Sequence, residues 1–167
     1  TSTGISTIST SDPVNGRFVL TSAGPNNVDA ASTFDVQNGT LTVSAPLADL
    51  FAAEMKISGL NKIGNGTLIL SSSNTYTGAT ILTAGTMALN GTGSVNSTSN
   101  ITVNGSGAKL LQTSSTAITP TVTLTQGVLT GSGTVNTVNV DNGTGGIISN
   151  NDGVAGASLT IGTLTFN

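Results

Sequence analysis

The sequence predicts an all-β fold, a parallel β-solenoid whose stacked coils are each about 20 residues long. Three observations lead to this prediction: short segments that alternate apolar and polar residues, Asn-Gly pairs between these segments, and a glycine that recurs before them at a near-constant spacing. They are typical of a chain that turns often and buries one face of each strand.

Short alternating segments supply the strands. In each, apolar residues at i and i+2 face one side and Thr or Asn faces the other, which is the period of a half-buried strand. We expect strands at residues 41–43, 101–103, 122–124, 138–140, 159–161 and 164–166.

Asn-Gly pairs supply the turns, because Asn and Gly adopt positive φ most easily. They stand at residues 15–16, 38–39, 65–66, 90–91, 104–105 and 142–143. An Asn-Gly pair is also the strongest hairpin signal, so an antiparallel sandwich or barrel is the alternative fold.

Glycine spacing favours the solenoid over the sandwich. A glycine shortly before an apolar segment recurs roughly every 20 residues, as in a stack of similar coils. These glycines are Gly66, Gly85, Gly107, Gly127, Gly146 and Gly162. Only 3% of the residues are aromatic, which suits a narrow interior filled by Leu, Ile and Val.

Composition limits the class of protein. The chain has 167 residues, and 36% of them are hydrophobic, enough to fold rather than stay disordered. Only 7% are charged, far below the usual share of about 25%. We expect one solenoid segment over residues 1–167, a fragment of a larger exported protein, because the first ten residues lack the pattern of a signal peptide.

Charge and apolar content exclude several partners. The formal net charge is -3, and the basic residues Arg17, Lys56, Lys62 and Lys109 are scattered, so we expect no nucleic-acid partner. No run of about 20 apolar residues is present for direct membrane insertion. With no cysteine, disulfides and thiolate metal sites are excluded.

One segment carries a family resemblance. Residues 59–70 (GLNKIGNGTLIL), 74–78 (NTYTG) and 84–89 (AGTMAL) resemble the autotransporter-associated β-strand repeat of bacterial passenger domains. The matching positions are Lys62, Gly64, Gly66, Thr67, Leu68, Leu70, Asn74, Tyr76, Gly78, Gly85 and Leu89. Residues 145–161 look like a later coil of that family, although residues 149–152 (SNND) replace its Pro-Gly turn. The resemblance implies a right-handed parallel β-helix at the bacterial surface, without catalytic residues.

Roles follow for the residues of this segment. We expect Gly66 and Gly85 to form tight corners, and the interior to be filled by Leu68, Leu70, Met87 and Leu89. Asn74 is expected to bond to backbone at a corner. Tyr76 is expected to cover the coil edge with its hydroxyl in water. The functional alternative is that Asn74 and Tyr76 form a sugar-stacking site.

Residues 45–56 (APLADLFAAEMK) depart from the strand pattern. Leu47, Leu50, Phe51 and Met55 fall at helical spacing, and Pro46 is acceptable in a first helical turn. We expect a short helix here that leaves the coil and either shields the core or offers a docking surface.

Catalytic, cofactor and metal sites are not expected. A polysaccharide-degrading β-helix enzyme needs clustered acids, but the six aspartates and Glu54 do not recur at the coil spacing and the chain has no histidine. Residues 141–143 and 150–153 offer oxygen ligands without the pattern of a calcium loop. Ice binding would need Thr-x-Thr arrays, and those at residues 40–42, 121–125 and 163–165 are not sustained coil after coil in the sequence.

Together these observations predict a non-enzymatic structural or adhesive segment of a bacterial surface or secreted protein, similar to an autotransporter passenger stalk. The expected partners are neighbouring solenoid coils of the full-length protein, host or environmental glycans, or further copies of the chain. A glycan- or ice-binding solenoid that uses Thr and Asn ladders is the alternative.

Overall fold

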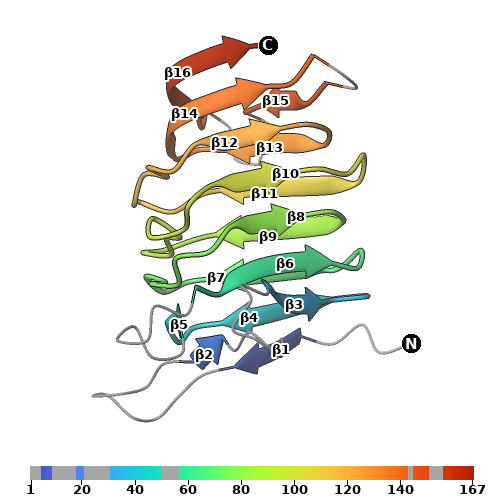
Figure 1. Ribbon diagram of the computed structural model, residues 1–167, viewed down its shortest axis with the longest axis vertical. Coiled ribbons are helices and arrows are strands. Elements are labelled where there is room, and N and C mark those ends of the chain that lie inside the picture. The colour runs from blue at the N-terminus through green and yellow to red at the C-terminus, as the bar shows by residue number, and fades with distance from the viewer. Residues whose placement is uncertain (1–4, 9–17, 21–30, 50–56, 143–144, 151–155) are drawn as a thin grey trace.

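The computed structural model describes residues 5–8, 18–20, 31–49, 57–142, 145–150 and 156–167. Within these residues the chain forms β-strands joined by turns, and no helix. The strands lie one above another along the longest axis of the molecule, from β1 (Ile5–Ile8) near one end to β16 (Thr160–Phe166) at the other (Figure 1).

Two seven-stranded sheets contain most of the strands. The first sheet has the order β1, β4 (Thr40–Val43), β7 (Thr67–Leu70), β9 (Gly85–Leu89), β11 (Ala108–Gln112), β13 (Val128–Gly131) and β15 (Ile147–Ser149). The second sheet has the order β3 (Ala31–Asp35), β6 (Gly59–Ile63), β8 (Thr80–Leu82), β10 (Ile101–Val103), β12 (Val122–Leu124), β14 (Thr134–Val140) and β16. A two-stranded sheet pairs β2 (Phe18–Leu20) with β5 (Leu47–Asp49).

Every strand pair in the described part of the chain is parallel, and from β6 onward successive strands alternate between the two large sheets. This is the arrangement of a parallel β-solenoid, so that prediction is confirmed and the antiparallel sandwich is excluded. The Asn-Gly pairs at residues 38–39, 65–66, 90–91 and 104–105 accordingly turn the chain from one sheet to the other and do not form hairpins, whereas residues 15–16 and 143 lie outside the described residues. The handedness of the coil stays a prediction.

Glycine 85 shows why the corners require glycine. Its φ is +66°, and a Cβ there would lie 2.4 Å from the carbonyl oxygens of both Gly64 and Gly66 in the coil before. Any other residue at this position would therefore have a strained backbone conformation, and its Cβ would overlap with the backbone of the coil before.

The glycine spacing correctly predicted a stack of coils, but the recurring glycines do not all occupy equivalent positions in those coils. Gly85 lies in register with Ala108, not with Gly107. Gly162 lies inside β16 in the second sheet, between the register pairs Val135–Ile161 and Thr137–Thr163. The expectation that Gly162 precedes a strand is wrong, because residues 159–161 and 164–166 belong largely to one continuous strand, β16.

The interior is filled by aliphatic side chains from both sheets. Leu68, Leu70, Met87 and Leu89 are all fully buried, which confirms their predicted place in the core. Ile69 lies between two of them on β7 and is only half-buried, on the outer face.

The helix expected at residues 45–56 is not formed in its described part. Leu47–Asp49 is strand β5, which pairs in parallel with β2, and Leu47 and Ala48 are buried in the stack. A short isolated helix is marginal in water, whereas this segment gains a strand partner and a place in the core. Residues 50–56 lie outside the described residues.

Candidate functional site

The repeat segment holds a buried lysine. Lys62 lies on the inward face of β6, and its Nζ donates to the carbonyl oxygens of Ile63 and Gly64, each at 2.7 Å, and of Ala84 at 3.2 Å. Burial lowers the pKa of Lys62, and the negative charge of Asp35 opposes this shift more weakly. The ammonium group thus joins the corner after β6 to the corner of the next coil.

Asn74 joins three successive levels of the stack. Its Oδ1 accepts from the backbone N–H of Leu47 at 2.9 Å, and its Nδ2 donates to the carbonyls of Ser72 at 2.9 Å and Ser94 at 2.8 Å. The expected bonding of Asn74 to backbone at a corner is confirmed. Because the amide has partners on both its oxygen and its nitrogen, it can be buried without a lost hydrogen bond.

Tyr76 is also buried, with 1% of its surface exposed, so the expectation of a hydroxyl in water is wrong. Its hydroxyl lies 2.7 Å from the Thr80 hydroxyl, which lies 3.1 Å from the Thr98 hydroxyl. The Thr80 hydroxyl thus gives the phenol the partner that it would otherwise need from water. Burial raises the pKa of Tyr76 well above its usual value, with the hydrogen bond to Thr80 acting weakly in the opposite direction.

The burial of Asn74 and Tyr76 also removes the sugar-stacking alternative for this pair. Asn74 has 3% of its surface exposed, and neither face of the Tyr76 ring is available to a ligand.

The other repeat residues pack the corners and faces of the coil. A Cβ at Gly78 would lie 2.5 Å from the backbone nitrogen of Gly59, so a side chain there would separate the coils. Gly64 has a φ of +73°, and a Cβ at Gly66 would lie 2.8 Å from Val36. Thr67 is half-buried on the outer face of the first sheet.

Sequence reasoning missed Asp49 and Gln112. The Asp49 carboxylate accepts from the backbone N–H groups of Ser58 and Thr77 and, at 2.7 Å, from the Thr77 hydroxyl. Gln112 is fully buried, and its Nε2 donates to the carbonyl of Thr116 at 2.7 Å. Neither residue stands in a pattern that marks it in the sequence: the Asp49 partner Thr77 lies 28 residues away, and Gln112 bonds to a backbone carbonyl, which any residue could offer.

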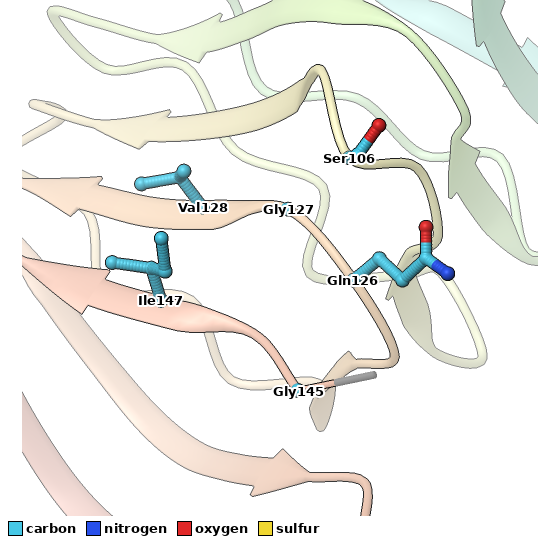
Figure 2. Close-up of a pocket in the computed structure, with 6 residues that line it drawn as sticks. All are labelled: Ser106, Gln126, Gly127, Val128, Gly145 and Ile147. Carbon is cyan, nitrogen blue, oxygen red and sulfur yellow. The ribbon is translucent and has the colours of Figure 1, made fainter. Parts of the chain in front are cut away.

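An open groove of about 290 Å³ lies on the outer face of the first sheet (Figure 2). Val128 and Ile147, register partners on β13 and β15, form its apolar side, and Ser106 and Gln126 supply neutral polar groups. Gly127 and Gly145 also line the groove. None of the described residues that line the groove is charged.

A hollow of about 400 Å³ lies on the outer face of the second sheet, where Gly59 and Gly78 leave the surface without side chains. Its lining includes Ile57 and Ile81, and none of its described lining residues is charged. Over the whole described part of the chain, no group of three or more His, Cys, Asp or Glu side chains could hold a metal ion. The described residues also contain no helix that is long and apolar enough to cross a membrane.

Comparison with known proteins gives one match. Residues 60–89 match the sequence family described as the passenger-associated-transport-repeat. No curated protein and no solved structure matches the chain. The matched residues run from β6 to the end of β9 and include Lys62, Asn74 and Tyr76. The chain therefore carries, at residues 60–89, an autotransporter-associated repeat of the passenger type.

Proposed function

We propose that the chain is a non-enzymatic structural segment of a bacterial surface or secreted protein, a stalk similar to those of autotransporter passengers. The observation that carries the proposal is the repeat match at residues 60–89. This repeat family belongs to autotransporter passengers, not to enzymes, and implies a surface or extracellular location.

The polar side chains of the repeat support this proposal, because their hydrogen bonds hold the stacked coils together and do not face a ligand. Lys62 and Asn74 join backbone groups of successive coils, and the Tyr76 hydroxyl is satisfied within the interior. Parallel strands about 4.8 Å apart bond to the coil above and the coil below, so the stack needs few charges to satisfy its backbone. Such a stack acts as a spacer, and β1 and β16 lie at its opposite ends (Figure 1).

On this proposal residues 1–167 are one solenoid segment of a larger exported protein. Its partners are neighbouring coils of that protein, and secondarily glycans or further copies of the chain. A polysaccharide-degrading activity has less support, because the Asp49 and Asp141 carboxylates both accept hydrogen bonds from threonine hydroxyls within the stack.

Antibodies raised against the purified chain test the proposal on bacteria that carry the natural gene. We expect intact cells, or the culture medium, to be labelled, and protease added to intact cells to remove the cell-bound signal. Labelling that appears only after the cells are permeabilised would contradict a surface or secreted location.

A further inference from the structure

The outer face of the second sheet carries a regular array of hydroxyl and amide side chains. A central column crosses the four strands β10, β12, β14 and β16 in the register of the strand pairing, and polar residues at or next to the strand ends flank it on both sides. We call these side chains the Thr/Asn array: Asn100, Thr102, Asn104, Thr121, Thr123, Thr125, Thr137, Asn139, Asp141, Thr163, Thr165 and Asn167.

The central column shows the arrangement. Thr102 pairs with Thr123, Thr123 with Asn139, and Asn139 with Thr165. On β10, β12 and β14 the neighbours of these residues along the strand are buried, so alternation directs the column outward. A hydroxyl or amide side chain therefore recurs on four successive strands of the sheet, and the column ends at Ile81 on β8. The unequal coil lengths conceal this recurrence in the sequence.

The four side chains of the central column, Thr102, Thr123, Asn139 and Thr165, lie at least partly exposed, and within the described residues none of them takes part in a side-chain hydrogen bond. The Thr125 hydroxyl, at the edge of the array, is already engaged within the protein and donates to Asp141 at 3.1 Å. By contrast, hydroxyls at the corners are engaged with the protein backbone, as those of Thr83, Thr98 and Ser115 are. The two groups of hydroxyls thus differ in what they contact.

We propose that the Thr/Asn array binds a neutral polysaccharide, with the polymer lying across the strands along the axis of the stack. This inference rests on the proposed surface function and adds to it a binding face and a ligand class.

Charge and hydrogen-bonding chemistry favour this ligand. The array contains no cation, and Asp141 is its one ionisable group, so an acidic polymer would meet no favourable charge. Hydroxyl and amide groups both donate and accept, as sugar hydroxyls do. Neighbouring strands present equivalent groups about 4.8 Å apart, so many weak contacts act together along one polymer.

Ordered water is the competing ligand, and the shape of the array disfavours it. Asn100, Asn104 and Asn139 are longer than the threonines beside them, so the donors and acceptors stand at unequal heights. A flexible glycan adapts to such a surface more readily than a water lattice does.

The outer face of the first sheet provides a matched control. Thr40, Thr67 and Thr86 form a column of register partners there, but Lys109, Val128 and Ile147 continue it, so the column loses its hydroxyls. Replacing these three threonines changes the same chemistry on the opposite sheet.

Co-sedimentation of the full chain with insoluble cellulose, amylose and mannan tests the inference, with insoluble polygalacturonate as the acidic comparison. We expect retention by at least one neutral polymer and little by polygalacturonate. The triple variant T102V/T123V/T165V should reduce retention roughly tenfold, because valine keeps the strand shape and removes the hydroxyl. The triple variant T40V/T67V/T86V should leave retention unchanged.

Circular dichroism melting checks that both triple variants fold. If the array variant does not fold, the single change Thr165→Asp, at an exposed position of β16, should still lower retention. No retention by any of the three neutral polymers would overturn the inference, as would equal losses in the array and control variants. Inhibition of ice recrystallisation without retention would also overturn it and identify ordered water as the ligand.

The test is separate from that of the proposed function. If intact cells are labelled but no polymer retains the chain, the polysaccharide-binding inference is overturned and the proposed surface function stands. Retention by the purified chain together with a strictly intracellular location would overturn the surface function and leave the binding face in place.

Discussion

The hydroxyl oxygen of Tyr76 lies 2.7 Å from Oγ1 of Thr80, and both side chains are buried inside the solenoid. Burial raises the pKa of Tyr76, so above pH 10 the native state keeps a proton that the unfolded state releases. Stability contributed by the neutral phenol is therefore present below pH 10 and lost as the pH rises. We predict that the free energy of unfolding falls by about 1.4 kcal/mol per pH unit above pH 10.

The chain has one tyrosine and no tryptophan, so tyrosinate absorbance reports on Tyr76 alone. The absorbance should rise only as the protein unfolds, and Tyr76→Phe should remove the added alkaline slope. The lowered pKa of Lys62 makes the free energy of unfolding rise with pH, the opposite direction, but this contribution is the same in the wild type and in Tyr76→Phe. Reversible ionisation near pH 10 with an unchanged circular dichroism spectrum would show that the ring is accessible.

Lys62→Met should lower the free energy of unfolding by about 2 to 3 kcal/mol, because three carbonyl oxygens lose their donor. Urea unfolding measures this change. Lys109→Met is the matched control, since Lys109 is exposed on the outer face of the first sheet, and we expect a change within about 0.5 kcal/mol. Similar losses in the two variants would contradict a special role for Lys62.

Leu68→Asp should prevent folding, because Leu68 is fully buried and an unpaired carboxylate there costs several kcal/mol. Ile69→Thr, on the outer face of the same strand, should fold with a loss of about 1 kcal/mol or less. Circular dichroism and thermal melting separate the two outcomes. Equal damage at the two positions would mean that another element covers the outer face of β7.

Treatment with a chelator should leave the melting temperature unchanged. The described residues hold no cluster of acidic, histidine or cysteine side chains that could bind a metal ion, so no ligand-linked stability is expected to be lost. Melting curves in the presence and absence of EDTA make the comparison. A clear drop with EDTA, restored by adding back calcium, would identify a metal site.

The open edge of β16 predicts association between copies. β16 is the last strand of the second sheet, and Leu164 and Phe166 remain 42% and 73% exposed although they continue the inward column of β14. Such an edge is a template for a further strand. Light scattering should show a mass that rises with concentration, and Phe166→Lys should reduce the rise. A monomer at millimolar concentration would show that the edge does not pair.

Several features could be predicted from sequence because they depend on local pattern. Alternation at residues 101–103 and 122–124 matches β10 and β12, and the repeat motif placed Leu68 and Leu70 in the core. These predictions succeed because the side-chain period of a strand is two, whichever strand becomes its neighbour.

Features that depend on distant partners could not be predicted in this way. The Tyr76 hydroxyl pairs with Thr80, whose hydroxyl is met inside the coil by Thr98, and residues 47–49 form a strand because β2 lies beside them. In both cases the deciding contact comes from another part of the chain.

The sequence by itself determined a low-charge solenoid of short parallel strands, because glycine corners and period-two alternation act over a few residues. Only the tertiary structure decided the register between coils of unequal length, since hydrogen bonding between stacked strands fixes which residues become neighbours. That register places Thr102, Thr123, Asn139 and Thr165 in one outward column and leaves Lys62 among the carbonyls of two corners.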